Sequence, residues 1–287
     1  MTIRAHPRAP WTGWVPTSPC GPDCQPAERG PVAALPLVAG RMTALVAVLL
    51  ATLVMAPFVP ASARVRWLRA CCAAALRASG VRLRVTGSVT GGGALLVSNH
   101  MSWIEILGVG AVHPVRMIAK LEVRDWPLIG GVAARSGALF VDRAGLHSLP
   151  ATVAATADAL RAGDVVGVFP EGTTWCGAAA GEFRRAAFQA AIEAGAPVVP
   201  VAVVLRPPGG APTADAAFIG EETLWDALMR VLRMPALECS LTVLPPLEPG
   251  ADRKDLARRA AEAVASVTGV PHPVSGAPRT TAPAVAA

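Results

Sequence analysis

The longest stretch of the chain without Asp, Glu, Lys or Arg is residues 42–63, and it limits the possible folds more than any other feature. Its 22 residues provide enough apolar helix to span a lipid bilayer. Pro57 and Pro60 weaken the last turn, so a re-entrant or interfacial helix is an alternative. Ala61-Ser62-Ala63 resembles a signal-peptide cleavage site, but the 41 residues in front are too long for a usual n-region. We therefore predict a retained membrane anchor.

The composition agrees with contact to a membrane. Hydrophobic residues make up 53% of the 287-residue chain and charged residues 16%, against about 45–50% and about 25% in typical proteins. The formal net charge of +6 favours anionic surfaces such as phospholipid headgroups. Nucleic acid is the poorer choice, because Tyr is absent, aromatic residues make up 5%, and no basic run alternates with stacking side chains.

The sequence divides into four parts. Residues 1–41 contain eight prolines and no helical or strand periodicity, so we predict that they are disordered. Residues 42–79 hold the anchor and a basic amphipathic helix that could lie on the membrane surface. Residues 80–270 form one domain, and residues 271–287, rich in Pro, Ala and Thr, are predicted to be a disordered tail.

Arginines crowd the far side of the anchor and indicate its orientation. By the positive-inside rule they place the following domain on the cytoplasmic side. The alternative is a secreted, processed protein whose mature chain begins at Arg64. The arginines are Arg64, Arg66, Arg69, Arg77, Arg82 and Arg84.

The domain alternates between short apolar runs and helical patterns. This alternation predicts an α/β fold, a largely parallel sheet with flanking helices, preceded by the N-terminal membrane-associated helix. The expected strands are 81–85, 94–98, 115–119, 138–141, 165–169, 198–205 and 240–244, and the expected helices are 65–78, 148–162, 182–194, 223–232 and 252–268.

The six cysteines are too few and too scattered for a disulfide framework. Cys20 and Cys24 have the spacing of half a zinc site, but no second pair follows at the usual separation. We expect reduced thiols, no metal and no bound cofactor.

His100 stands where an expected strand ends and a helix begins, which is where α/β sheets tend to bind ligands. With Glu105 five residues on, it could act as an oriented general base. The two lie about 140° apart on one continuous helix, so they can meet only if His100 lies in the turn before it. The alternative is structural, because Ser102-x-x-Glu105 also fits a capping box.

Two further strand ends carry charged residues. Phe169-Pro170-Glu171-Gly172-Thr173-Thr174 predicts a tight loop that exposes backbone N–H groups beside Glu171. Phe140-Val141-Asp142-Arg143 ends in a guanidinium suited to a phosphate or carboxylate. Taken singly, each could be an ordinary turn or a surface ion pair.

Taken in order, these elements resemble the glycerolipid acyltransferase family, the lysophosphatidic acid acyltransferases and their relatives. That family carries Asn-His-x4-Asp, then Phe-x-x-Arg, then Phe-Pro-Glu-Gly-Thr, then a Val-Pro strand. Here the matching elements are Asn99-His100 with Glu105, Phe140 to Arg143, Phe169 to Thr173, and Val199-Pro200, and residues 120–130 look like the family's link between the first two.

The resemblance implies an O-acyltransferase that moves a fatty acyl chain from acyl-CoA or acyl carrier protein to the hydroxyl of a lysophospholipid. His100 would be the general base and Glu105 would hold its imidazole. Arg143 would bind the acceptor's anionic headgroup, and Glu171, Gly172 and Thr173 would shape the polar pocket.

Two departures from the family pattern bear on activity and acceptor. The acid is Glu105 where the family usually has Asp, which motivates the alternative of an inactive lipid-binding membrane protein. Thr174 follows Glu-Gly-Thr where enzymes specific for lysophosphatidic acid often have Arg. The expected acceptor is 1-acylglycerol-3-phosphate, giving phosphatidic acid in phospholipid biosynthesis, and a lyso-ornithine lipid or another lysolipid is the alternative.

Overall fold

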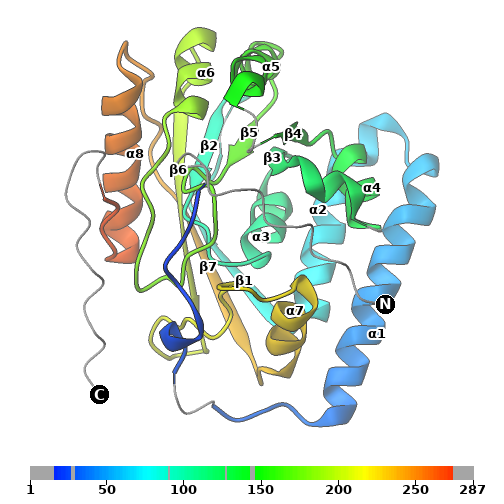
Figure 1. Cartoon of the computed structure of the whole chain (residues 1–287). Helices are drawn as coiled ribbons and strands as arrows, with labels where there is room; N and C mark the ends of the chain where they lie inside the picture. The colour runs from blue at the N-terminus through cyan, green and yellow to red at the C-terminus, as the bar shows by residue number, and fades with distance from the viewer. Residues whose placement is uncertain (1–15, 27–29, 90, 127, 143–145, 274–287) are drawn as a thin grey trace.

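The computed structural model describes residues 16–26, 30–89, 91–126, 128–142 and 146–273 (Figure 1). Within these residues, seven strands form one sheet in the order β1-β7-β6-β2-β5-β3-β4, and every pairing is parallel except β6 with β7. The strands are β1 Val81–Thr86, β2 Leu95–Ser98, β3 Arg116–Lys120, β4 Leu139–Val141, β5 Val166–Val168, β6 Val198–Arg206 and β7 Leu237–Val243.

Helices cover both faces of this sheet. The helices are α1 Leu35–Met55, α2 Ala61–Ala78, α3 Ile104–Val112, α4 Ile129–Arg135, α5 Leu149–Arg161, α6 Ala186–Ala194, α7 Leu224–Arg233 and α8 Arg253–Thr268. Short 3-10 helices are η1 Pro22–Cys24, η2 Ala56–Phe58, η3 Leu121–Asp125 and η4 Leu146–Ser148. The predicted α/β class with a largely parallel sheet is confirmed, and each expected strand overlaps an observed one.

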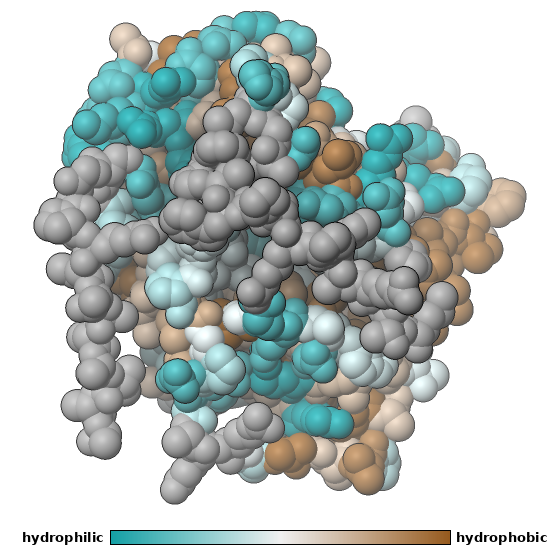
Figure 2. Space-filling view, in the orientation of Figure 1, coloured by the Kyte–Doolittle hydropathy of each residue, from teal (hydrophilic) through white to brown (hydrophobic). Residues whose placement is uncertain are grey.

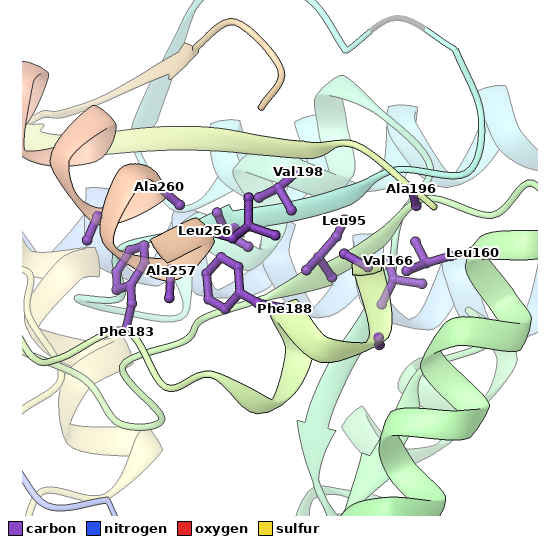
Figure 3. Close-up of a cluster of buried hydrophobic side chains, with 14 of the residues drawn as sticks. Leu95, Leu160, Val166, Phe183, Phe188, Ala196, Val198, Leu256, Ala257 and Ala260 are labelled. Atoms are coloured by element: carbon purple, nitrogen blue, oxygen red, sulfur yellow. The ribbon is translucent and has the colours of Figure 1, made fainter. Parts of the chain in front are cut away.

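The sheet separates two hydrophobic cores because strand side chains alternate between its faces. Leu95 and Val97 of β2 point into the core under α5, α6 and α8, where Phe188 is fully buried (Figure 3). Leu96 points into the opposite core with Ile104 of α3 and side chains of α2 and α7. A strand buried on both faces needs apolar residues at successive positions, which is the pattern that predicted these strands.

The apolar N-terminal helix lies earlier in the chain than residues 42–63. It begins at Leu35, with Pro36 in its first turn where no intrahelical N–H is needed, and it ends at η2, which contains Pro57. Arg41 lies inside this helix. Its guanidinium donates to the main-chain oxygens of Leu232 and Met234 at the end of α7, at 2.8 and 2.6 Å. The charge of Arg41, which we expected to precede the anchor, therefore lies within α1 and joins this helix to the domain through hydrogen bonds.

Among the described residues, one helical stretch, Leu35–Phe58, is long and apolar enough to cross a membrane, with a mean hydropathy of 2.1. Much of this surface is exposed, and hydrophobic side chains gather on the side of the molecule formed by α1 and α2 (Figure 2). Exposed residues there are Leu35, Leu37, Val46, Leu50, Val54, Met55, Phe58 and Val65.

Of residues 1–41 and 271–287, where the sequence predicts disorder, the structure describes 16–26, 30–41 and 271–273. Residues 16–26 lie against the domain, with Cys20 buried beside Cys176. Residues 271–273 follow α8 and bury His272. Contacts with the domain, rather than a strand or long helix of their own, hold residues 16–26 and 271–273 in place.

Phe188→Ala should lower the free energy of unfolding by about 3–5 kcal/mol, because it removes a ring that is fully buried between sheet and helices. Chemical unfolding of the detergent-solubilised protein measures the change. Phe58→Ala is the matched control, since Phe58 is 76% exposed and should change stability by less than about 0.5 kcal/mol. Equal effects of the two substitutions would contradict this description of the core.

Candidate active site

The candidate site lies at the carboxyl ends of β2 and β5. These strands pair in parallel, with Val97 opposite Val168, so the segments that leave them emerge side by side. His100 follows β2, and Glu171 follows β5. The backbone N–H of His100 donates to Glu171 Oε2 at 2.6 Å, which joins two motifs 71 residues apart.

The turn after β5 places an aromatic ring on the histidine. Phe169 stacks on the His100 imidazole, with ring centroids 4.0 Å apart and an interplanar angle of 11°. The N–H of Gly172 donates to the Phe169 carbonyl at 3.0 Å and closes the turn. Gly172 has a φ of +75°, and a Cβ there would lie 2.5 Å from Cγ of Pro16, so this position requires glycine.

Glu105 holds the loop that carries His100. Its Oε1 accepts the N–H groups of Met101 at 2.6 Å and Ser102 at 2.8 Å, and its Oε2 also accepts from Ser102 at 2.9 Å. The carboxyl half of the predicted capping box is therefore present, while the residue before α3 is Trp103, which makes no side-chain cap bond. That Glu105 also orients the imidazole stays a prediction.

Asn99, which precedes His100 in the first motif, completes the end of β2. Its side-chain amide donates to the Val203 carbonyl and its Oδ1 accepts the Val203 N–H, both at 2.9 Å. The side chain thus continues the pairing of β2 with β6 by one more step. Asparagine fits here because a single amide supplies one donor and one acceptor.

His272, which sequence reasoning missed, reaches the site from the segment after α8. Its Nδ1 lies 3.7 Å from Glu171 Oε1 and donates to the Gly181 carbonyl at 2.8 Å. The Gly181 N–H in turn donates to Glu171 Oε1 at 2.9 Å. No local pattern marks His272, because it lies in a Pro-rich segment outside the periodic elements.

Burial shifts the ionisation of these groups. Removal from water raises the pKa of Glu105 to about 8, although the backbone N–H bonds oppose the shift. Burial likewise raises the pKa of Glu171 to about 8, and the nearby Glu105 charge raises it further. The N–H bonds from Gly181 and His100 act in the opposite direction and lower this pKa. Burial lowers the pKa of His272. Burial therefore favours the neutral form of both acids.

A cavity of about 210 Å³ adjoins these residues. His100, Glu171 and His272 lie in its wall, together with aliphatic residues of β6 and of the loop after β5. An imidazole beside a largely apolar cavity can take a proton from a hydroxyl group whose hydrocarbon part lies in that cavity.

The remaining predicted site residues are placed differently. Thr173 follows Gly172 in the turn and is partly buried. Arg143 lies outside the described residues, and Asp142 before it is exposed at the end of β4. Three strand spacings separate β4 from β2, about 14 Å, because strands lie about 4.8 Å apart.

Residues 82–204 match the family model described as Acyltransferase, a span that holds His100 and Glu171. The chain is 38% identical over 199 residues to a lyso-ornithine lipid O-acyltransferase of Pseudomonas aeruginosa, covering 69% of this chain and 75% of that protein. It is 34% identical over 145 residues to a 1-acyl-sn-glycerol-3-phosphate acyltransferase of Neisseria gonorrhoeae, covering 50% of this chain and 56% of that protein.

A solved structure has the same fold. The crystal structure of the 1-acyl-sn-glycerophosphate (LPA) acyltransferase PlsC from Thermotoga maritima superposes with a TM-score of 0.64 at 18% identity. The match covers 82% of this chain and 94% of that chain.

Glu105→Ala should lower the free energy of unfolding by about 2–5 kcal/mol, because it leaves buried N–H groups unpaired and opens a cavity. Glu105→Gln is the matched variant, since its single side-chain oxygen can still accept both N–H groups, and it should cost about 1 kcal/mol or less. Unfolding curves at pH 6 compare the three proteins. A Gln variant as unstable as the Ala variant would refute this loop-holding role.

The raised pKa of Glu105 predicts a pH dependence. The pKa is about 8 in the folded chain against an ordinary value of 4.5, so the folded state binds this proton more tightly. The stability contributed by the neutral acid is complete below pH 4.5 and is lost as the pH rises through 8. Wild-type protein should therefore lose more stability between pH 6 and pH 9 than Glu105→Gln does; parallel curves would contradict the assignment.

Proposed function

The chain belongs to the acyltransferase family, and we propose that it transfers a fatty acyl chain from an acyl thioester to the hydroxyl of a lysolipid. The observation that carries the proposal is the position of His100, stacked on Phe169 and bound through its N–H to Glu171 beside a cavity. Two family motifs from adjacent strands meet there, in a chain that also has an apolar helix for membrane contact.

In the proposed reaction His100 acts as the general base. Its imidazole takes the proton of the acceptor hydroxyl as that oxygen attacks the thioester carbonyl carbon. The new C–O bond replaces the C–S bond when the tetrahedral intermediate collapses, and the proton passes to the departing thiolate. Ester and free thiol are the products, and no acyl-enzyme is needed.

The carboxyls on either side of His100 act by positioning it. Glu171 fixes the N–H of His100 itself, and Glu105 fixes the next two N–H groups of the same loop. Because burial raises the pKa of both acids and so favours their neutral forms, they hold the loop with less negative charge beside the reaction. A neutral surrounding suits a step in which an oxyanion develops.

The substrates reach this site from a bilayer. Exposed apolar residues of α1 and η2 would anchor the protein, and the cavity would take the acyl or lysolipid chain. Acyl-CoA or acyl carrier protein is the proposed donor, with the domain on the cytoplasmic side. Gly172 and Thr173 would line the headgroup pocket, and Arg143 would bind an anionic group.

We place a lyso-ornithine lipid ahead of 1-acylglycerol-3-phosphate as acceptor. The similarity to the Pseudomonas aeruginosa protein extends over more of both chains than the similarity to the Neisseria gonorrhoeae protein. In addition, Thr174 stands where a phosphate-binding arginine often follows Glu-Gly-Thr, and its hydroxyl donates to the Phe218 carbonyl, so it serves the fold.

His100→Ala should reduce acyl transfer by about 100-fold or more, the expected loss for a general base. Membranes containing the wild-type or variant protein receive labelled acyl-CoA, or acyl carrier protein charged with the same chain. Lyso-ornithine lipid and lysophosphatidic acid are supplied in separate reactions, and labelled product is measured. His147→Ala, at an exposed residue of η4, is the control and should leave turnover unchanged.

Unchanged turnover in His100→Ala would remove His100 from the mechanism. Faster acylation of lysophosphatidic acid than of lyso-ornithine lipid would reverse the acceptor assignment. Lysolipid binding without product from either donor would identify the chain as a lipid-binding relative without activity.

A further inference from the structure

Three cysteine thiols meet beside the candidate active site. Sγ atoms of Cys20, Cys24 and Cys176 all lie within 4.8 Å of one another. Cys20 and Cys24 come from the N-terminal segment around η1, and Cys176 lies in the loop after β5, 156 residues beyond Cys20. The sequence suggested only half a zinc site, because the third thiol arrives through tertiary structure.

The surroundings of these thiols are those of buried sulfur ligands. Cys20 and Cys176 are 6% and 3% exposed, and Cys24 is partly buried. Ala217 and Ile219 cover the group. The backbone N–H of Cys176 donates to Cys20 Sγ at 3.4 Å, and this hydrogen bond stabilises negative charge on that sulfur.

The spacing suits a common metal ion. Tetrahedral zinc with bonds of about 2.3 Å holds its sulfur ligands about 3.8 Å apart, so the three thiols need to close by about 1 Å or less. A disulfide of about 2.05 Å would join two of these sulfurs and leave the third out. Thiolates select soft or borderline cations over magnesium or calcium.

We propose that Cys20, Cys24 and Cys176 bind one zinc ion. Each Sγ–H bond is replaced by an Sγ–Zn bond, and the thiol protons leave to solvent. Three sulfurs fill three of the four tetrahedral positions, and water or another group takes the fourth.

The zinc ion ties residues 16–26 to the loop after β5. The backbone N–H of Trp175, next to Cys176, donates to the His100 carbonyl at 2.8 Å, and Pro16 packs on Gly172. The metal site therefore stabilises the wall of the cavity at which the proposed acyl transfer occurs. Metal binding itself does not depend on that activity.

The test measures the metal content of full-length, untagged protein purified in detergent without chelators. Inductively coupled plasma mass spectrometry should find about one zinc per chain. Cys20→Ser and Cys176→Ser should each lower zinc retention by about tenfold or more, since losing even a residue that supports a metal ligand costs about 10–100-fold in affinity. Cys71→Ser, on α2, is the matched control and should keep its zinc.

Two further readouts use the wild-type protein, so they do not depend on a variant that fails to fold. Cobalt added to the metal-free protein should give the charge-transfer and visible bands of a tetrahedral thiolate site. Removal of zinc by a chelator should speed amide hydrogen exchange in residues 16–26 and leave exchange in β6 unchanged.

Three outcomes would overturn the proposal. Wild-type protein could carry no zinc and give no cobalt–thiolate bands. Cys20→Ser and Cys176→Ser could retain zinc as Cys71→Ser does. Peptide mapping of freshly isolated, alkylated wild-type protein could find two of the three cysteines joined, with the loss of two hydrogens, which would make the cluster a disulfide site.

Discussion

The parallel pairing of β2 with β5 is the constraint on which the candidate active site depends. It brings the ends of two strands that are far apart in sequence to one edge of the sheet, 4.8 Å or so apart. His100 and the turn that begins at Phe169 directly follow these strands, so they lie next to each other. The stacking of Phe169 on the imidazole and the bond from the His100 N–H to Glu171 follow from that adjacency. Antiparallel pairing would have sent the two motifs to opposite edges.

Two buried acids organise the loop after β2 from opposite sides. Glu171, from the neighbouring strand, binds the N–H of His100, while Glu105, from the next helix, binds those of Met101 and Ser102. Three consecutive N–H groups are thus satisfied by two side chains inside the protein. Burying an acid is costly unless it is hydrogen-bonded or neutral; here both acids accept backbone N–H bonds, and burial raises the pKa of each.

The two ends of the described chain close over this site. Pro16 and Cys20 pack on the loop after β5, and His272 fills the space beside Glu171 from the segment after α8. At the other end of the domain, Arg41 anchors the apolar helix α1 to the end of α7. Residues 16–26 and 271–273, which lack periodicity, therefore acquire their structure from single side chains that contact the domain, and this is why a pattern of residues did not predict it.

The sequence by itself determined the strands, the α/β class and the loops that carry His100 and Glu171. Strands buried on both faces consist of successive apolar residues, and both loops directly follow such runs. It also showed the motif order that identified the family. Only the tertiary structure decided which strand lies beside which. The contact of Glu171 with His100, the approach of His272 and the meeting of Cys176 with Cys20 therefore appeared only in three dimensions. Local periodicity records which face of an element is buried, whereas contacts across 70 or more residues depend on strand order, which no local pattern encodes.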